Sequence, residues 1–160
     1  MFHNLFTRIV VVFWLVIAAA EVAPLRVAHA QDNHLADVLA QVNQVRAERG
    51  LRPVQLSDSH NAAAQRQLND MLAHDFLGHI GTDGTKPSQR VAAAAYRWRA
   101  VGENCLYRWD YNAAAAVAQW VNSPAHMANL IYAGFRDAGI AYGQTAAGKI
   151  YYVLVLAAPL

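Results

Sequence analysis

The 160-residue chain has a single cysteine, Cys105, and only 15% charged residues. One thiol cannot form an internal disulfide, so the fold must depend on its hydrophobic core and not on covalent cross-links. The 13 basic and 11 acidic residues nearly balance at a net charge of +2. Because the basic residues are scattered, they lack the concentrated basic face that nucleic-acid binding requires, and no nucleic-acid partner is expected. The hydrophobic content of 56% excludes wholesale disorder and predicts one domain with a packed core.

The first thirty residues have the pattern of a secretory signal sequence. Arg8 precedes an apolar run over residues 9–20, and Ala28-His29-Ala30 supplies the small-x-small ending of a cleavage site. The run is shorter than the about 20 residues of a permanent membrane helix. We therefore predict a signal peptide over residues 1–30, cleavage after Ala30, and a secreted or periplasmic domain over residues 31–160 with no stable membrane span. Retention as an N-terminal anchor is the alternative.

Apolar spacing and capping residues predict five helices in the mature chain. They are expected over residues 35–45 with Gly50 as a C-cap, from Ser57 or Asp58, over residues 87–95, after Asp110 or Asn112, and from Ser123-Pro124. The lone cysteine lies between the third and fourth of these. In an exported protein without a second cysteine we expect this thiol to be free and buried, because free cysteine packs like a small hydrophobe.

The C-terminal third is predicted to contain strands. Residues 135–142 and 150–156 are β-rich, and Gly143–Gly148 is suited to a hairpin loop. Residues 150–156 are apolar at every position, so helices must cover this strand on both faces. The sequence thus predicts an α+β fold, a single-domain three-layer α-β-α sandwich with helices first and strands late.

One glutamate stands out because of its surroundings. Residues 31–160 contain only Glu48 and Glu103, and Glu103 lies in the otherwise apolar stretch Ala100–Leu106. A buried carboxylate is costly unless it is paired, hydrogen-bonded or bound to a cation. A structural carboxylate bonded to neighbouring backbone amides and a functional carboxylate both remain open.

Two histidines lie where loops and helix ends commonly carry function. His79 lies in a glycine-rich turn between the second and third helices, and His126 lies in the first turn of the helix that Ser123-Pro124 begins. A helix N-terminus lowers the pKa of an imidazole and favours the neutral, metal-binding form. Taken singly, either histidine is more often an ordinary hydrogen-bonded residue. The remaining mature-chain histidines, His34, His60 and His74, fall on helix positions expected at the surface.

Three ordered motifs resemble a known family. His79-x-Gly81-x-Asp83-Gly84, Gly102-Glu103-Asn104 and Trp120-x-x-Ser123-Pro124-x-His126-x-x-Asn129 occur in this order. Together they resemble the bacterial branch of the cysteine-rich secretory, antigen 5 and pathogenesis-related superfamily, the SCP or CAP domain. The resemblance extends from about Leu35, through Asn43-x-x-Arg46-x-x-x-Gly50, to the final hairpin, and it implies the same α-β-α sandwich.

The resemblance also implies a site. It places His79, Glu103 and His126 around a central cavity, with His79 and His126 as ligands of a divalent cation, Zn²⁺ or another. The sequence departs from the family because no second glutamate follows Trp120, Met127 stands where bacterial relatives often have arginine, and the eukaryotic disulfides are absent. With only two protein nitrogens, a zinc ion is expected to bind modestly and less well below a pH of about 6.5.

Two functions remain open. The first is a secreted ligand-binding or interaction module for a small-molecule, lipid, glycan or protein ligand, with no catalytic residues assigned. The second is a metal-dependent hydrolase that acts on an envelope or extracellular polymer, with Glu103 as the base. We favour the binding module because fold resemblance does not establish chemistry, and because Ser123, the one candidate nucleophile, is explained as a helix cap.

Overall fold

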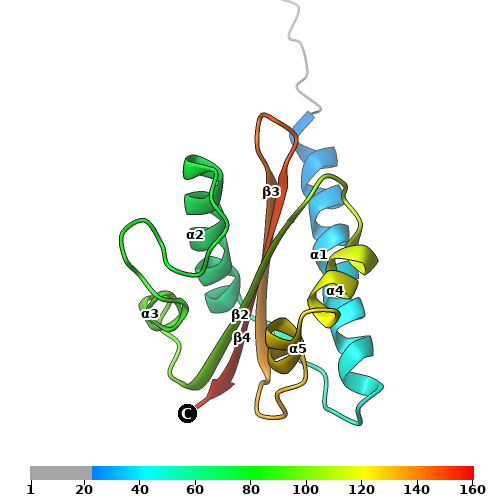
Figure 1. The fold of residues 1–160 in the computed structure, drawn as a ribbon, viewed down its shortest axis with the longest axis vertical. Coiled ribbons are helices and arrows are strands. Elements are labelled where there is room, and N and C mark those ends of the chain that lie inside the picture. Colours follow the sequence, from blue (N-terminus) through cyan, green and yellow to red (C-terminus); the bar gives the residue numbers. More distant parts are fainter. Residues whose placement is uncertain (1–22) are drawn as a thin grey trace, which may run out of the picture.

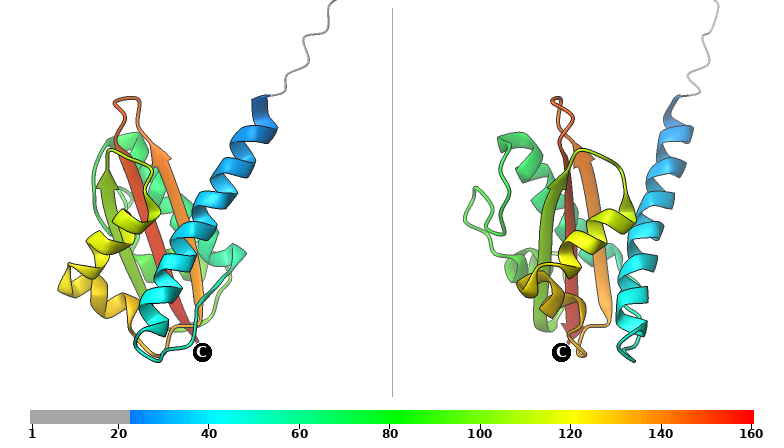
Figure 2. Two further views of the ribbon diagram at one scale, coloured as in Figure 1. Left: turned by 90° about the vertical axis from the view of Figure 1, so that its right-hand side faces the viewer. Right: turned by 45° about the vertical axis from the view of Figure 1, so that its right-hand side comes forward.

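The computed structural model describes residues 23–160, with side chains from Asn33 onward. A four-stranded sheet lies between two helical layers (Figure 1). Helices α1 (Ala23–Ala47), α4 (Ala113–Val121) and α5 (Pro124–Leu130) cover one face, and α2 (Asp58–His74) and α3 (Pro87–Ala93) cover the other (Figure 2). The predicted three-layer α-β-α sandwich is confirmed.

Most of the predicted signal sequence lies outside the described residues. The description begins at Ala23, and the predicted cleavage point after Ala30 falls within α1. Within residues 23–160, no helix combines the length and apolar character needed to cross a bilayer. The signal sequence therefore stays a prediction.

The sheet has the order β1-β3-β4-β2. β1 (Gln55–Leu56) is parallel to β3 (Asp137–Gln144), whereas β4 (Ile150–Pro159) is antiparallel to both β3 and β2 (Trp98–Arg108). The predicted order of helices first and strands late is wrong for two strands, because β1 and β2 precede α4. Buried on both faces in its middle, β2 lacks the apolar–polar alternation that marks a half-exposed strand.

The core divides into two clusters on the two faces of β4. Ile150, Tyr152, Leu154, Leu156 and Ala158 pack with residues of α1, α4 and α5. Tyr151, Val153 and Val155 pack with residues of α2 and α3. Alternate side chains of an extended strand point to opposite faces, so the prediction that this apolar run is covered on both sides is confirmed.

Four of the five predicted helix starts agree with the observed ones, whereas the first helix, expected from residue 35, begins at Ala23. Ser57, Asn112 and Ser123 occupy the N-cap positions of α2, α4 and α5, and the Asn112 side chain accepts from the backbone N–H of Ala115. Gly50 follows α1 with φ +66°, a left-handed conformation that favours glycine. Neither Ser57 nor Ser123 makes a capping hydrogen bond through its side chain.

A buried arginine fixes α1 to the segment that follows α5. Arg46 is fully buried and donates to the backbone carbonyl oxygens of Arg52, Leu130, Tyr132 and Phe135. Because several carbonyls satisfy its donors, this guanidinium is held without a carboxylate partner among the residues that the structure describes.

His60 departs from the expected surface position, because it is fully buried where α2 crosses β3. Its ring packs edge-on against Tyr96, with centroids 4.3 Å apart, and within the described residues neither ring nitrogen has a hydrogen-bond partner. A Cβ atom on Gly139 would come within 2.0 Å of the His60 carbonyl carbon. This close backbone approach explains why α2 buries a histidine here.

Candidate functional site

The Gly102-Glu103-Asn104 motif lies in β2, an edge strand of the sheet. Consecutive side chains alternate between the two faces, so Glu103 points to the α2–α3 side while Gly102 and Asn104 point to the α5 side. A Cβ atom on Gly102 would lie 2.8 Å from Asn129 Oδ1. Glycine is therefore required for the close packing of α5 on the strand.

Asparagine side chains fix the start of α5 to β2. Asn104 Nδ2 donates to the backbone oxygen of His126 at 3.1 Å. Asn129 Nδ2 donates to Asn104 Oδ1 at 2.8 Å and to the Glu103 carbonyl at 3.2 Å. These bonds hold His126 next to the strand that carries Glu103.

On the opposite face, Glu103 forms a buried ion pair with Arg90 of α3. Arg90 donates to Glu103 Oε2 at 2.7 Å, and each side chain is only 1% exposed. Arg90 also donates to the backbone carbonyls of His79 at 3.1 Å and Thr85 at 2.9 Å. Within residues 33–160 the carboxylate is thus paired with side chains, which answers the question left open by the sequence, and Arg90 links it to the loop that carries His79.

His79 lies against the second carboxylate oxygen. Its Nδ1 is 3.0 Å from Glu103 Oε1, and the His79 side chain is 47% exposed. Because a carboxylate only accepts, Nδ1 carries the proton of this bond, which leaves the Nε2 lone pair available. The second histidine, His126, lies beside this ring, with centroids 6.4 Å apart and ring planes at 63°.

The electrostatics favour a neutral imidazole at His126. Burial and, secondarily, the neighbouring His79 lower the pKa of His126. The pKa is lowered as the sequence predicts, but the causes are burial and the neighbouring His79 and not the helix N-terminus. The structure therefore brings His79, Glu103 and His126 together from three separate elements.

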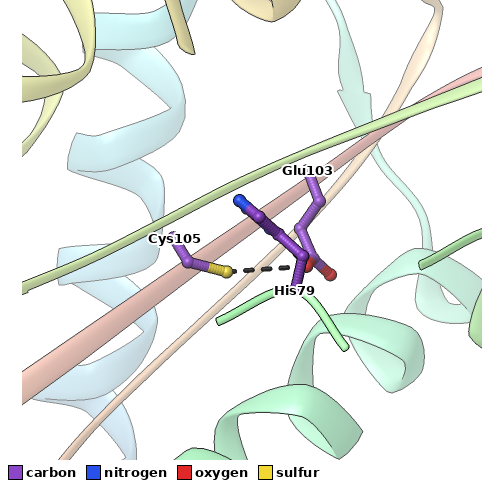
Figure 3. Close-up of side chains that lie close together, drawn as sticks. All are labelled: His79, Glu103 and Cys105. Atoms are coloured by element: carbon purple, nitrogen blue, oxygen red, sulfur yellow. Dashed lines mark hydrogen bonds and ion pairs between the residues drawn. The ribbon is translucent and has the colours of Figure 1, made fainter. Parts of the chain in front are cut away.

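Cys105 forms a second group of possible metal donors with His79 and Glu103, different from the His79–His126 pair. Ligand atoms of His79, Glu103 and Cys105 lie within 4.8 Å of one another, and Figure 3 shows the three side chains close together. The Cys105 thiol is free and buried, as predicted, and donates to Glu103 Oε1 at 3.6 Å. Burial and the Glu103 charge raise the pKa of this thiol. Since a thiol must lose its proton to ligate a metal, Cys105 is a poorer donor than either imidazole.

The donor set fits a zinc ion with a small adjustment. Two imidazoles on one tetrahedral zinc, with Zn–N bonds of about 2.0–2.1 Å, have ring centroids about 5 Å apart. The observed 6.4 Å therefore requires an approach of about 1 Å. The half-exposed His79 ring, on a loop, is the one with room to move.

For three residues near this site, the structure shows a role that the sequence did not predict. Arg90 was not predicted to belong to the site. The signal that could have indicated it is that a buried Glu103 needs a positively charged partner. Met127, where the resemblance implies arginine, packs against the core on the α1 side. Ser123 occupies the N-cap of α5, but its side chain does not make the capping bond that was assumed for it.

The fold is a three-layer sandwich in which two motif histidines, on a loop and on α5, lie together beside the edge strand β2. The family model for the cysteine-rich secretory protein family, CAP, matches residues 39–156. The chain therefore belongs to the CAP family, and the resemblance inferred from the three motifs is confirmed.

A curated relative and several solved structures are similar to this chain. The uncharacterized protein YkwD of Bacillus subtilis is 22% identical over 108 residues, which are 68% of this chain and 42% of that protein. The chain thus spans less than half the length of this relative.

The solved structures support the fold. An outer surface protein of Borrelia burgdorferi has a TM-score of 0.73 at 18% identity, and the match covers 80% of this chain and 94% of that protein. An extracellular SCP-domain protein of Bacillus anthracis has a TM-score of 0.72 at 17% identity, and the match covers 84% of this chain and 43% of that protein. A structure of NaASP2 with Zn²⁺ has a TM-score of 0.54 at 12% identity, and the match covers 76% of this chain and 77% of that protein.

Proposed function

We propose that residues 31–160 form an exported CAP module that binds a divalent cation, Zn²⁺ in preference, between His79 and His126. The observation that carries the proposal is the 3.0 Å bond from His79 Nδ1 to Glu103, made beside the His126 ring. A bond at Nδ1 orients the imidazole and leaves Nε2 for the metal, an arrangement common at protein zinc sites. The neighbouring structure of NaASP2 with Zn²⁺ supports the choice of metal.

Glu103 acts in this proposal as a positioning residue. Both of its oxygens are engaged, Oε1 by His79 and Cys105 and Oε2 by Arg90. When bound, the ion would supply open coordination positions for an oxygen or nitrogen atom of an incoming ligand. His79 and His126 hold the ion, and Glu103, itself paired with Arg90, orients the His79 ring through Nδ1.

The same contacts favour a binding module over a hydrolase. A general base must reach a water molecule, but the Glu103 side chain is only 1% exposed. Its Oε1 accepts from His79 and Cys105 and its Oε2 pairs with Arg90, so this buried carboxylate does not meet the requirement for the base of the hydrolytic alternative. We therefore propose a ligand-binding or interaction role for this site.

Calorimetric titration of the metal-free protein with Zn²⁺ tests the site. The parent should bind with modest affinity, and the His79→Ala/His126→Ala double variant should not bind. His74→Ala, which removes an exposed histidine of α2, is the matched control and should bind like the parent. Glu103→Gln should weaken binding without abolishing it. Equal binding by the double variant and the parent would show that the site is assigned to the wrong residues.

The pH dependence has a defined direction. Protons compete with the metal for imidazole, so Zn²⁺ affinity should fall as the pH drops below about 6.5, the ordinary histidine pKa. The lowered pKa of His126 keeps that ring neutral further into the acid range.

Export is tested separately. The Borrelia and Bacillus anthracis neighbours are described as outer-surface and extracellular proteins, which supports an extracytoplasmic location. Mass spectrometry of the extracytoplasmic fraction should find an N-terminus at or near Gln31. Intact Met1 in a membrane pellet would instead establish the anchor.

A further inference from the structure

Two aromatic rings are exposed at the end of β2, away from the histidines. Tyr107 is 44% exposed and Trp109 63%, and neither belongs to the two core clusters. Their rings are neighbours, with centroids 6.4 Å apart and planes at 85°. Ring area that stays in water does not gain the free energy of apolar burial. The exposed pair is therefore better explained as part of a binding surface than as part of the core packing.

A polar network borders the rings. Arg108 Nε donates to Asp110 Oδ1 at 2.6 Å, and its terminal amino group donates to Oδ2 at 3.0 Å. The other terminal amino group of Arg108 lies 3.4 Å from Gln119 Oε1 of α4. Arg108 and Asp110 form a bidentate pair, and the Asp110 side chain, 55% exposed, is open to accept from an incoming hydroxyl group. The Gln119 side-chain N–H groups take no part in this bond and can donate to a ligand.

The rings and the network line one open cleft. Its volume is about 350 Å³, and Tyr107, Arg108, Trp109, Asp110 and Gln119 form its walls. This volume lies at the small end of the range of about 300–1,000 Å³ for ligand sites. Glu103 and Trp109 are six positions apart, about 20 Å of extended chain, so the cleft is separate from the proposed metal site.

We propose that this cleft binds a neutral saccharide, with a pyranose ring stacked on Trp109. A pyranose has apolar C–H faces, which match a flat indole, and an equatorial rim of hydroxyl groups that both donate and accept. The cleft offers both partners, because Asp110 accepts while Arg108 and Gln119 donate.

Charge selects a neutral ligand. The Arg108 and Asp110 charges cancel within the cleft wall. Lys149, whose Nζ lies 5.5 Å from the centre of the Tyr107 ring, is paired with Asp75 at 2.7 Å, so neither an anion nor a cation gains net attraction there. Sugars whose substituents are all equatorial leave both faces apolar, as in β-1,4-linked glucose and N-acetylglucosamine polymers. The ligand class is therefore a β-1,4-linked neutral glycan.

Titration of the exported protein with cellotetraose and chitotetraose, followed by calorimetry and tryptophan fluorescence, tests this site. The parent should bind at least one of the two, and Trp109→Ala should weaken binding about tenfold or more because the stacked ring is lost. Trp98→Ala is the matched control: Trp98 is 37% exposed at the opposite end of β2 and should leave the affinity unchanged. Because Trp109 lies outside the core clusters, its replacement should leave the urea midpoint unchanged.

The outcomes separate this proposal from the metal site. The His79→Ala/His126→Ala variant should bind the saccharide like the parent even if it binds no zinc. No binding by the parent to either tetramer, or equal binding by Trp109→Ala, would overturn the saccharide site. Sedimentation measures whether the rings instead join two copies of the chain. If the parent forms a dimer that Trp109→Ala abolishes, and binds no sugar, the proposal is overturned.

Discussion

Replacing Arg90 by methionine would leave the Glu103 carboxylate buried beside neutral donors only. The ion pair joins two side chains that are each 1% exposed, at 2.7 Å, so water cannot take the place of the guanidinium. The same substitution removes the bonds from Arg90 to the carbonyls of His79 and Thr85. Methionine preserves most of the volume of the arginine stem, so the main change is electrostatic.

The expected loss is large compared with the stability of a domain. Removing one partner of a buried ion pair costs about 3–5 kcal/mol, because the remaining charge is uncompensated. Native domains are stable by only about 5–15 kcal/mol, so Arg90→Met should come close to unfolding the protein. The double variant Arg90→Met/Glu103→Gln has no buried charge, and we expect it to be more stable than Arg90→Met alone.

Urea unfolding measures these differences through the midpoint at constant slope. The matched control is Arg66→Met, since Arg66 pairs with Asp83 at a similar 2.6 Å but the side chains are 48% and 51% exposed. An exposed pair is worth about 0–1 kcal/mol, so this variant should be nearly as stable as the parent. An Arg90→Met variant that loses no more unfolding free energy than Arg66→Met, or that Glu103→Gln fails to stabilise, would show that the buried charge is not the cause.

Three further predictions concern buried groups. The Cys105 thiol, whose pKa burial and Glu103 raise, should react with an aromatic disulfide reagent only after denaturation; rapid labelling of the native protein would contradict its burial. Burial lowers the pKa of His60, so the folded state takes up protons less readily than the unfolded state. The free energy of unfolding should therefore fall as the pH drops below about 6.5, and His60→Phe should reduce this dependence; an equal slope in both proteins would exclude His60 as the cause. Gly139→Ala should lower the free energy of unfolding in urea by at least about 3 kcal/mol, because the new Cβ would lie 2.0 Å from the backbone of His60. Gly102→Ala should cost less, because its nearest contact is a side chain; the opposite order would contradict this.

The helices and the central strand were predictable because their signals are local. The N-caps Ser57, Asn112 and Ser123 mark helix starts by residue type, and the unbroken apolar run of β4 requires cover on both faces. The resemblance added the motif residues His79, Glu103 and His126, which the structure brings together.

The remainder depends on contacts between segments distant in sequence. The sequence does not predict β2, because a glycine, a glutamate and an asparagine interrupt the apolar residues in its buried middle. Arg90 lies on an alanine-rich helix, and nothing in its local sequence indicates that it turns toward Glu103. His60 has the local pattern of an exposed helix residue, and only the crossing of α2 over Gly139 buries it.

The position of β2 at the edge of the sheet explains how three consecutive residues organise the candidate site. Alternation sends Glu103 to one face, where it bonds His79, and Asn104 to the other, where it holds the backbone of His126. A central strand would keep the two histidines apart, because neighbouring strands would block both sides. At an edge strand the His79 loop and α5 reach past the open side, and the two rings come within 6.4 Å. A one-residue slip of β2 against β4 would turn Glu103 toward α5 and Asn104 toward Arg90, so the site depends on the strand register as much as on the identity of its residues.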